Sequence, residues 1–130
     1  MPTREQLVAA NDATYAAWNA HDPDAVAAVF AENAELRDAG SAEAVVGRDA
    51  IRERAAGLLE QFPDFHLERV QLIVEPPRNA DRWVATATHA ESGKPVRVEG
   101  ATFTELDDDG LVVRDFNFID TAALQAQLSG

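Results

Sequence analysis

The sequence predicts an α+β fold in which a curved antiparallel β-sheet wraps around N-terminal helices and gives the domain a cone shape. Apolar residues recur at helical spacing as far as Phe62, and from Phe65 onward the pattern changes to four extended segments. Clusters of turn-forming residues separate these segments. No internal repeat or linker interrupts residues 1–130, so we expect one domain whose open mouth offers a concave ligand site.

The first two predicted helices carry start signals. Thr3 with Gln6 three residues later is a capping-box signature. Asp22 before Pro23 predicts an N-cap with proline in the first turn of a short second helix. Helical spacing in the first helix continues through Leu7, Val8, Asn11, Tyr15 and Trp18.

A brief strand, Asn33–Asp38, is expected before the third helix. Gly47-Arg48-Asp49 leads into this helix, and Pro63 ends it. Asp120 or Thr121 is expected to cap one or two final helical turns. The apolar positions of the third helix are Ile51, Ala55, Leu58, Leu59 and Phe62.

The extended segments predict an antiparallel meander. Their dividers are Pro76-Pro77, Glu91–Lys94 and Asp107–Gly110. The predicted strands are Phe65–Glu75, Arg82–Ala90, Val96–Leu106 and Leu111–Ile119.

The composition excludes several classes of function. Eleven basic against 23 acidic residues give a net charge of −12, which repels nucleic acid and anionic membranes. The absence of cysteine excludes thiolate catalysis and cysteine-bound metal clusters. The N-terminus has no apolar signal segment, and no run of about 18 apolar residues occurs. We therefore expect a soluble cytoplasmic protein, without cofactor or metal, that binds a small molecule.

Asp38 is the first candidate catalytic residue, because it ends a predicted strand just before the turn Ala39-Gly40-Ser41. Its side chain is then held at the strand end. Beneath apolar helices the carboxylate would lose hydration and gain proton affinity, which suits a general base near neutral pH. The alternative is structural, since aspartate often caps such a turn by accepting backbone N–H bonds.

The last hairpin supplies the second candidate. If Leu106 faces Leu111, then Thr102 lies opposite Asp115 and Gly100 opposite Asn117. Aspartate is unfavourable in the middle of a strand, so Asp115 invites a functional explanation. The side chains that would share its face are Thr102, Asn117, Val98 and Val113.

Several ordered motifs cover nearly the whole chain, from about Tyr15 to Leu128. They are Trp18–Asp22, Val29–Ala34, the Asp38–Ser41 turn, Gly47–Arg52, Asp109–Val113 and Asp120. This set resembles the nuclear transport factor 2-like superfamily, of cystatin-like fold, and in particular its SnoaL-like and ketosteroid-isomerase-like branches. The resemblance implies the cone-shaped fold, whereas the reaction stays open because the cone hosts isomerases, cyclases, hydrolases, dehydratases and non-catalytic modules.

By position, Asp38 matches the aspartate with which ketosteroid isomerases move a proton between carbons. Their oxyanion tyrosine falls on Thr14, one residue before Tyr15, and their protonated aspartic acid falls on Thr102. Both strong donors are therefore missing.

The SnoaL-like branch implies other site residues. In its cyclases an acid/base carboxylate projects from the last strand, near Asp115 or Asn117. Its members often place a histidine where His89 ends a strand, and titration near pH 6.5 would serve proton transfer. The resemblance also implies a homodimer, because the opposite sheet face carries an apolar cluster that a second subunit commonly covers: Phe103, Phe116 and Phe118.

These observations lead to a cofactor-free isomerase or cyclase acting on a hydrophobic, carbonyl-bearing substrate. Asp38 or Asp115 would remove a proton alpha to the carbonyl. The expected substrate-binding residues are Tyr15, Trp18, His89, Thr102 and Asn117.

Two alternatives stay open. Water activation, as in epoxide-hydrolase relatives, would need an arginine bridging two aspartates inside the cone, but Arg37, Arg97 and Arg114 alternate to other faces. A non-catalytic ligand-binding or dimerisation module would explain the missing oxyanion donors.

Overall fold

The computed structural model describes all 130 residues. They form helices and the strands of a single sheet. The helices are α1 (Arg4–Asn19), α2 (Pro23–Ala28), α3 (Arg48–Gln61) and α4 (Thr121–Ser129). The strands are β1 (Phe30–Asp38), β2 (Val45–Val46), β3 (His66–Glu75), β4 (Arg78–Thr88), β5 (Pro95–Leu106) and β6 (Val112–Ile119). None of the helices is long and apolar enough to cross a membrane.

The predicted helix starts are confirmed. The Thr3 hydroxyl accepts a bond from the Gln6 backbone N–H at 3.1 Å, and the Gln6 side chain accepts one from the Thr3 N–H at 2.8 Å. The Asp22 carboxylate accepts from the Ala25 N–H at 3.2 Å, with Pro23 in the first turn. Gly47 precedes α3 with φ of 95°, a left-handed conformation that favours glycine.

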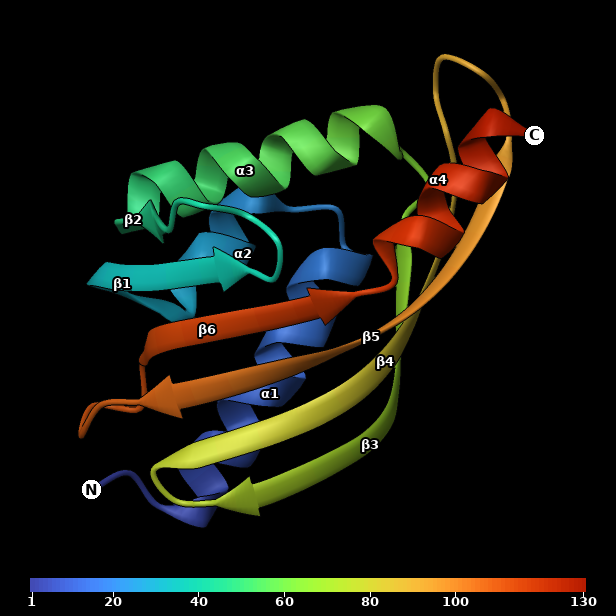
Figure 1. Ribbon diagram of the computed structural model, residues 1–130. Coiled ribbons are helices and arrows are strands. Elements are labelled where there is room, and N and C mark those ends of the chain that lie inside the picture. The colour runs from blue at the N-terminus through green and yellow to red at the C-terminus, as the bar shows by residue number, and fades with distance from the viewer.

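The sheet is open and strongly curved, in the order β2-β1-β6-β5-β4-β3. Strands β3 to β6 form the predicted antiparallel meander, while β1 joins β6 in parallel. Figure 1 shows α1 lying across the concave side and α3 running above β1. The α+β cone predicted from the sequence is therefore confirmed, with the short strand β2 as an addition to it.

The register of the last hairpin differs from the prediction by two residues. Thr102 pairs with Asn117, and Asp115 pairs with Thr104. One residue of the shift arises at the loop, because Leu106 pairs with Val112 and not with Leu111. The other arises from a bulge, because Glu105 pairs with Arg114 and leaves Val113 as an extra residue. A two-residue shift preserves the face of a side chain, so Asp115 and Asn117 keep their predicted face, whereas Val113 does not line the cavity.

Two strands begin earlier in the chain than predicted. Strand β1 begins at Phe30 instead of Asn33, and β4 begins at Arg78 instead of Arg82. The Pro76-Pro77 turn is therefore shorter than expected, and Arg78 pairs directly with Glu75. This places Asn79 and Asp81 in β4, where both are buried.

The main hydrophobic core lies where α1, α2 and α3 meet β1 and the start of β6. A smaller cluster of Phe62, Ala87 and Val96 packs with Leu124 and Leu128 of α4. The main cluster comprises Leu7, Ala17, Val26, Phe30, Ala34, Leu36, Ile51, Ala55, Leu106 and Val112. Between the two clusters the concave face carries polar side chains instead.

Candidate functional site

A cavity of about 180 Å³ lies between the helices and the concave face of the sheet. Twenty of its 31 lining residues are hydrophobic, including Trp18, Phe62 and Leu124. The polar residues come from α1, α3, β1, β4, β5 and β6, so the cavity joins nearly every element of the fold. A mostly apolar hollow with a few polar groups is the usual form of a small-molecule site.

The sheet register arranges the polar lining residues in two neighbouring rows. One row runs Asp81, Thr102, Asn117, Asp38 across β4, β5, β6 and β1. The next row runs Asn79, Thr104, Asp115, Leu36 across the same strands. Because residues two apart on a strand face the same side, both rows point into the cavity.

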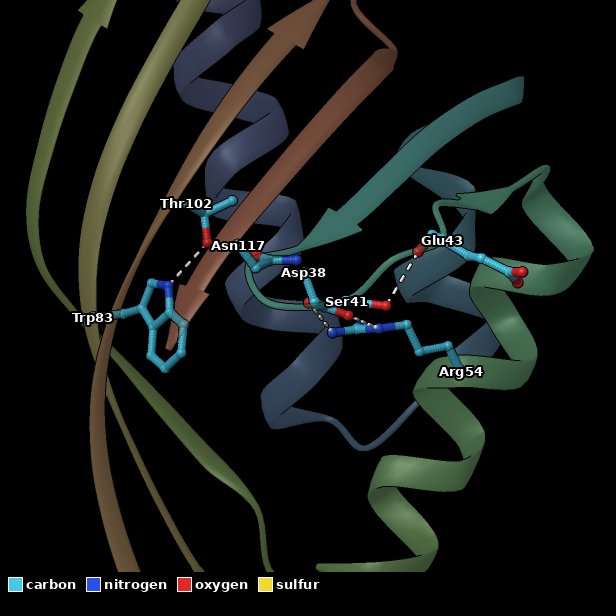
Figure 2. A network of polar contacts seen from close by, with 7 residues as sticks. All are labelled: Asp38, Ser41, Glu43, Arg54, Trp83, Thr102 and Asn117. Carbon is cyan, nitrogen blue, oxygen red and sulfur yellow. Dashed lines mark hydrogen bonds and ion pairs between the residues drawn. The ribbon is translucent and has the colours of Figure 1, made fainter. Parts of the chain in front are cut away.

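Asp38 is held by an arginine. Both of its carboxylate oxygens accept bonds from Arg54 of α3, Oδ2 from Nε at 3.1 Å and Oδ1 from Nη2 at 2.8 Å. Figure 2 shows the guanidinium reaching from the helix to the end of β1. Such a two-pronged pair fixes the orientation of both groups. The turn-capping alternative for the Asp38 side chain is thus replaced by an ion pair, and only its backbone oxygen accepts the Ser41 N–H.

Asp115 is the most perturbed carboxyl in the cavity. Asp115 as a whole is half-buried, but its Oδ1 is inaccessible to solvent and has no hydrogen-bond partner. Burial raises the pKa of Asp115 to about 7, and the carboxylates of Asp81 and Asp38 add to that rise. The charge of Arg54 and the side chain of Asn117 oppose it.

A chain of hydrogen bonds fixes the Asn117 amide. The Trp83 indole donates to the Thr102 hydroxyl at 2.9 Å, and this hydroxyl donates to Asn117 Oδ1 at 2.8 Å (Figure 2). The indole can lie flat on β5 because its cross-strand partner is Gly100, where any Cβ would collide with the ring. With its oxygen engaged, Asn117 offers its NH₂ group as a donor.

A second polar cluster involves α1. The Tyr15 hydroxyl donates to Asp81, and the Asn11 amide donates to the same oxygen at 3.4 Å. Arg69 donates to Asn11 Oδ1 at 2.7 Å. Burial raises the pKa of Asp81 and, together with the Asp81 charge, raises that of Tyr15. The Tyr15 hydroxyl therefore stays protonated and uses its proton in the hydrogen bond to Asp81.

Most of the residues predicted for the site meet in this one cavity. Those that line it are Tyr15, Trp18, Asp38, Thr102, Asp115 and Asn117. His89 does not line it. It follows β4 in the connection to β5, where its Nδ1 bonds to the Ser92 hydroxyl at 2.9 Å and its ring packs on Phe62. Because β4 ends at Thr88, His89 lies in the connection that follows the strand.

Sequence reasoning missed Arg54, Asn11, Asn79, Asp81 and Trp83. Arg54 had a detectable signal, because it stands three residues after Ile51 and four before Leu58, inside the apolar face of α3. Asn79 and Asp81 were assigned to a turn. No group of three or more His, Asp or Glu side chains is arranged to hold a metal ion.

Comparison with known proteins identifies the family and the fold. The sequence profile of the SnoaL-like domain family matches residues 12–115. A search of curated proteins gives no match. A solved structure from Jannaschia sp. CCS1, provisionally named a SnoaL-like polyketide cyclase, has a TM-score of 0.89 at 20% identity, covering 100% of this chain and 96% of that one.

Two further solved structures share the fold. SalBIII, an epoxide hydrolase/cyclase-like enzyme of pyran ring formation in the polyether salinomycin, has a TM-score of 0.84 at 19% identity, covering 95% of this chain and 97% of that one. A ketosteroid isomerase-like protein from Catenulispora acidiphila DSM 44928, crystallised with trimethylamine, has a TM-score of 0.83 at 19% identity, covering 91% and 90%. With a profile match over most of its length, this protein belongs to the SnoaL-like domain family.

Proposed function

We propose that the protein is a cofactor-free isomerase or cyclase in which Asp115 transfers a proton at a carbon alpha to a carbonyl group of a hydrophobic substrate. One observation carries the proposal: an aspartate with a pKa of about 7 and an unpartnered Oδ1 lines a mostly apolar cavity. A group that is half ionised near neutral pH can both take and return a proton.

Asp115 is a better base than Asp38. Both oxygens of Asp38 already accept bonds from Arg54, whereas Asp115 Oδ1 accepts none. In the proposed step Asp115 takes the alpha proton, and the electron pair of the broken C–H bond moves to the carbonyl oxygen. Return of the Asp115 proton to another carbon of the enolate gives an isomer. Attack of the enolate carbon on a second carbonyl instead closes a ring, and Asp115 then gives its proton to the new alkoxide oxygen.

The enolate oxygen needs donors, and hydrogen bonding within the cavity decides which are free. Thr102 gives its proton to Asn117, and Tyr15 gives its proton to Asp81. The donors that would stabilise the anion are the Arg54 N–H groups that do not bind Asp38 and the N–H of the Asn117 amide that is not engaged with Asp115. Thr102 and Tyr15 are therefore assigned positioning roles instead of the direct enolate contacts expected from the sequence.

The experiment follows deuterium exchange at the alpha carbons of 2-tetralone, a bicyclic ketone, in D₂O by NMR. We expect the protein to accelerate exchange and Asp115→Asn to reduce the acceleration by a factor of about 100 or more, since the base is lost. Asp38→Asn should have the smaller effect, and the exposed Asp49→Asn on α3 is a charge-matched control. Equal exchange with Asp115→Asn and the unaltered protein contradicts the proposal; ligand binding without exchange favours a non-catalytic module.

Arg54 supports a second candidate, water activation at an epoxide. The sequence offered no suitable arginine, but Arg54 pairs with Asp38 inside the cavity, and its charge also acts on Asp115. In this scheme protonated Asp115 gives its proton to the epoxide oxygen as water attacks carbon, and Asp38 receives the water proton. Indene oxide distinguishes the two candidates, because diol formation that is lost in Arg54→Met would favour this one.

The homodimer expected from the sequence is proposed here for the outer sheet face. Phe103, Phe116 and Phe118 are 54%, 39% and 45% exposed, and the rings of Phe116 and Phe118 stack with centroids 4.8 Å apart. Glu105 and Arg114 lie beside them. An apolar patch with charges of both signs can pair with a copy of itself across a two-fold axis.

A further inference from the structure

We propose that Asn79 forms a subsite of the cavity that binds a hydroxyl group of the substrate, on the far side of a ring system from Asp115. This deepens the proposed function, on which it rests, by naming the substrate class: a compact ring compound that carries a hydroxyl opposite its reacting carbon.

The burial of Asn79 is the first observation. The residue is 5% exposed, it lines the cavity, and its side-chain Oδ1 is shut off from solvent without a hydrogen-bond partner. Buried side-chain amides in proteins are normally hydrogen-bonded, so an unpartnered one on a residue that lines a ligand cavity indicates a group that the ligand satisfies.

The position of Asn79 on the sheet is the second observation. Asn79 pairs with Thr104, and Thr104 pairs with Asp115, so the three residues form one row across β4, β5 and β6. Asn79 and Asp115 are two strand spacings apart, or about 10 Å between backbones. Asp115 Oδ1 also lacks a partner. A molecule resting on Thr104 therefore meets an unpartnered polar oxygen at each end of the row.

The chemistry of the row selects a hydroxyl group. The Asn79 amide is neutral and offers both a donor and an acceptor, as a hydroxyl does. Anionic groups are disfavoured, because Asp38, Asp81 and Asp115 line the same cavity and the net charge is −12. Neighbouring Asp81 already accepts two bonds on its Oδ2, from Tyr15 and Asn11.

The cavity volume limits the size of the buried ring system. An engineered protein cavity of about 150 Å³ binds benzene, and this cavity measures about 180 Å³. It therefore accommodates one or two fused rings, which also matches a span of two strand spacings.

The test compares naphthalene and 2-naphthol as probes in ¹H–¹⁵N NMR titrations. For the unaltered protein we expect 2-naphthol to bind about tenfold more tightly than naphthalene, the usual effect of one net hydrogen bond. The Asn79 side-chain amide signal should shift with 2-naphthol and stay in place with naphthalene. In Asn79→Leu the preference for 2-naphthol should disappear while naphthalene still binds.

A matched control variant locates the effect. Asn33→Leu, at an exposed asparagine of β1 that does not line the cavity, should keep the tenfold preference. Retention of the preference in Asn79→Leu, or no preference in the unaltered protein, overturns the proposal. The Asn79 signal in the unaltered protein decides the matter if the leucine variant does not fold.

The result is independent of catalysis. Failure of the exchange reaction with 2-tetralone, which has no hydroxyl, would leave the binding preference measurable. Loss of the preference would leave exchange intact.

Discussion

At the scale of single residues, the surroundings of Asp115 change the pKa of its carboxyl group. In water its carboxyl would be ionised at neutral pH, but within the cavity desolvation opposes the charge more than Arg54 supports it. The neighbouring Asp38 keeps a full ion pair with the same arginine. Two carboxyl groups of the same type thus take different roles, one fixed and one free to exchange a proton.

The raised pKa of Asp115 predicts a pH-dependent stability. The folded protein keeps the Asp115 proton up to about pH 7, whereas the unfolded chain releases it near pH 3.8. This favourable contribution is present below pH 3.8 and is lost as the pH rises from about 4 to 7, a loss of up to about 4 kcal/mol. Asp115→Asn should therefore raise the free energy of unfolding more at pH 8 than at pH 4, measured by urea titration. An equal change at both pH values would contradict the prediction.

Arg54 should tune the proton affinity of Asp115. Arg54→Met removes a positive charge that lowers the pKa of Asp115, so this pKa should rise above 7. The measurement is a ¹³C NMR titration of the carboxyl group. Arg52→Met, on the exposed side of the same helix, is the matched control and should leave the titration unchanged. A titration curve that does not move in Arg54→Met would show that the guanidinium does not act on Asp115.

Sequence patterns located single residues where the strand period was clear. Thr102, Asp115 and Asn117 share one sheet face, as strand alternation predicts, even with the register two residues out. Arg54 was missed because a charged residue within a helix face is ordinarily solvated, and its partner lies on a distant strand. The periodicity of a single helix or strand does not predict such contacts between separate elements.

At the scale of elements, helix ends were the most predictable features. The caps at Thr3, Asp22 and Asp120 lie where expected, since capping depends on a few adjacent residues. The bulge at Val113 and the parallel pairing of β1 with β6 could not be predicted in this way. Both depend on how the hairpin and the N-terminal helices fit together in space.

The contact between β4 and β5 at Gly100 predicts a paired result. Gly100→Ala would place a Cβ against the Trp83 ring and 2.6 Å from the Phe118 oxygen. The indole must move, which breaks its bond to Thr102 and should cost about 1–3 kcal/mol of stability. Gly57→Ala, on an exposed part of α3 with open space, should instead stabilise by up to about 1 kcal/mol. Thermal unfolding and tryptophan fluorescence measure both; an unaffected Gly100→Ala would mean that the indole has another resting place.

At the scale of the whole molecule, the exposed outer face of the sheet predicts a homodimer. If a copy covers the outer face, sedimentation equilibrium should give twice the chain mass of 14.1 kDa. Phe116→Lys should shift the protein toward the monomer, because it places a charge in the apolar contact. Val46→Lys, at an exposed position on β2, should not. A concentration-independent mass near 14 kDa for the unaltered protein would exclude the dimer.

The parallel pairing of Leu36 with Asp115 joins an early and a late part of the chain. During synthesis Asp38 and Arg54 emerge first, but Asp115 arrives only with β6, which inserts between β1 and β5. Until then both of those strands expose unpaired backbone edges, a state prone to aggregation. The cavity is therefore completed at the same moment as the exposed strand edges are covered, when the final strand is inserted.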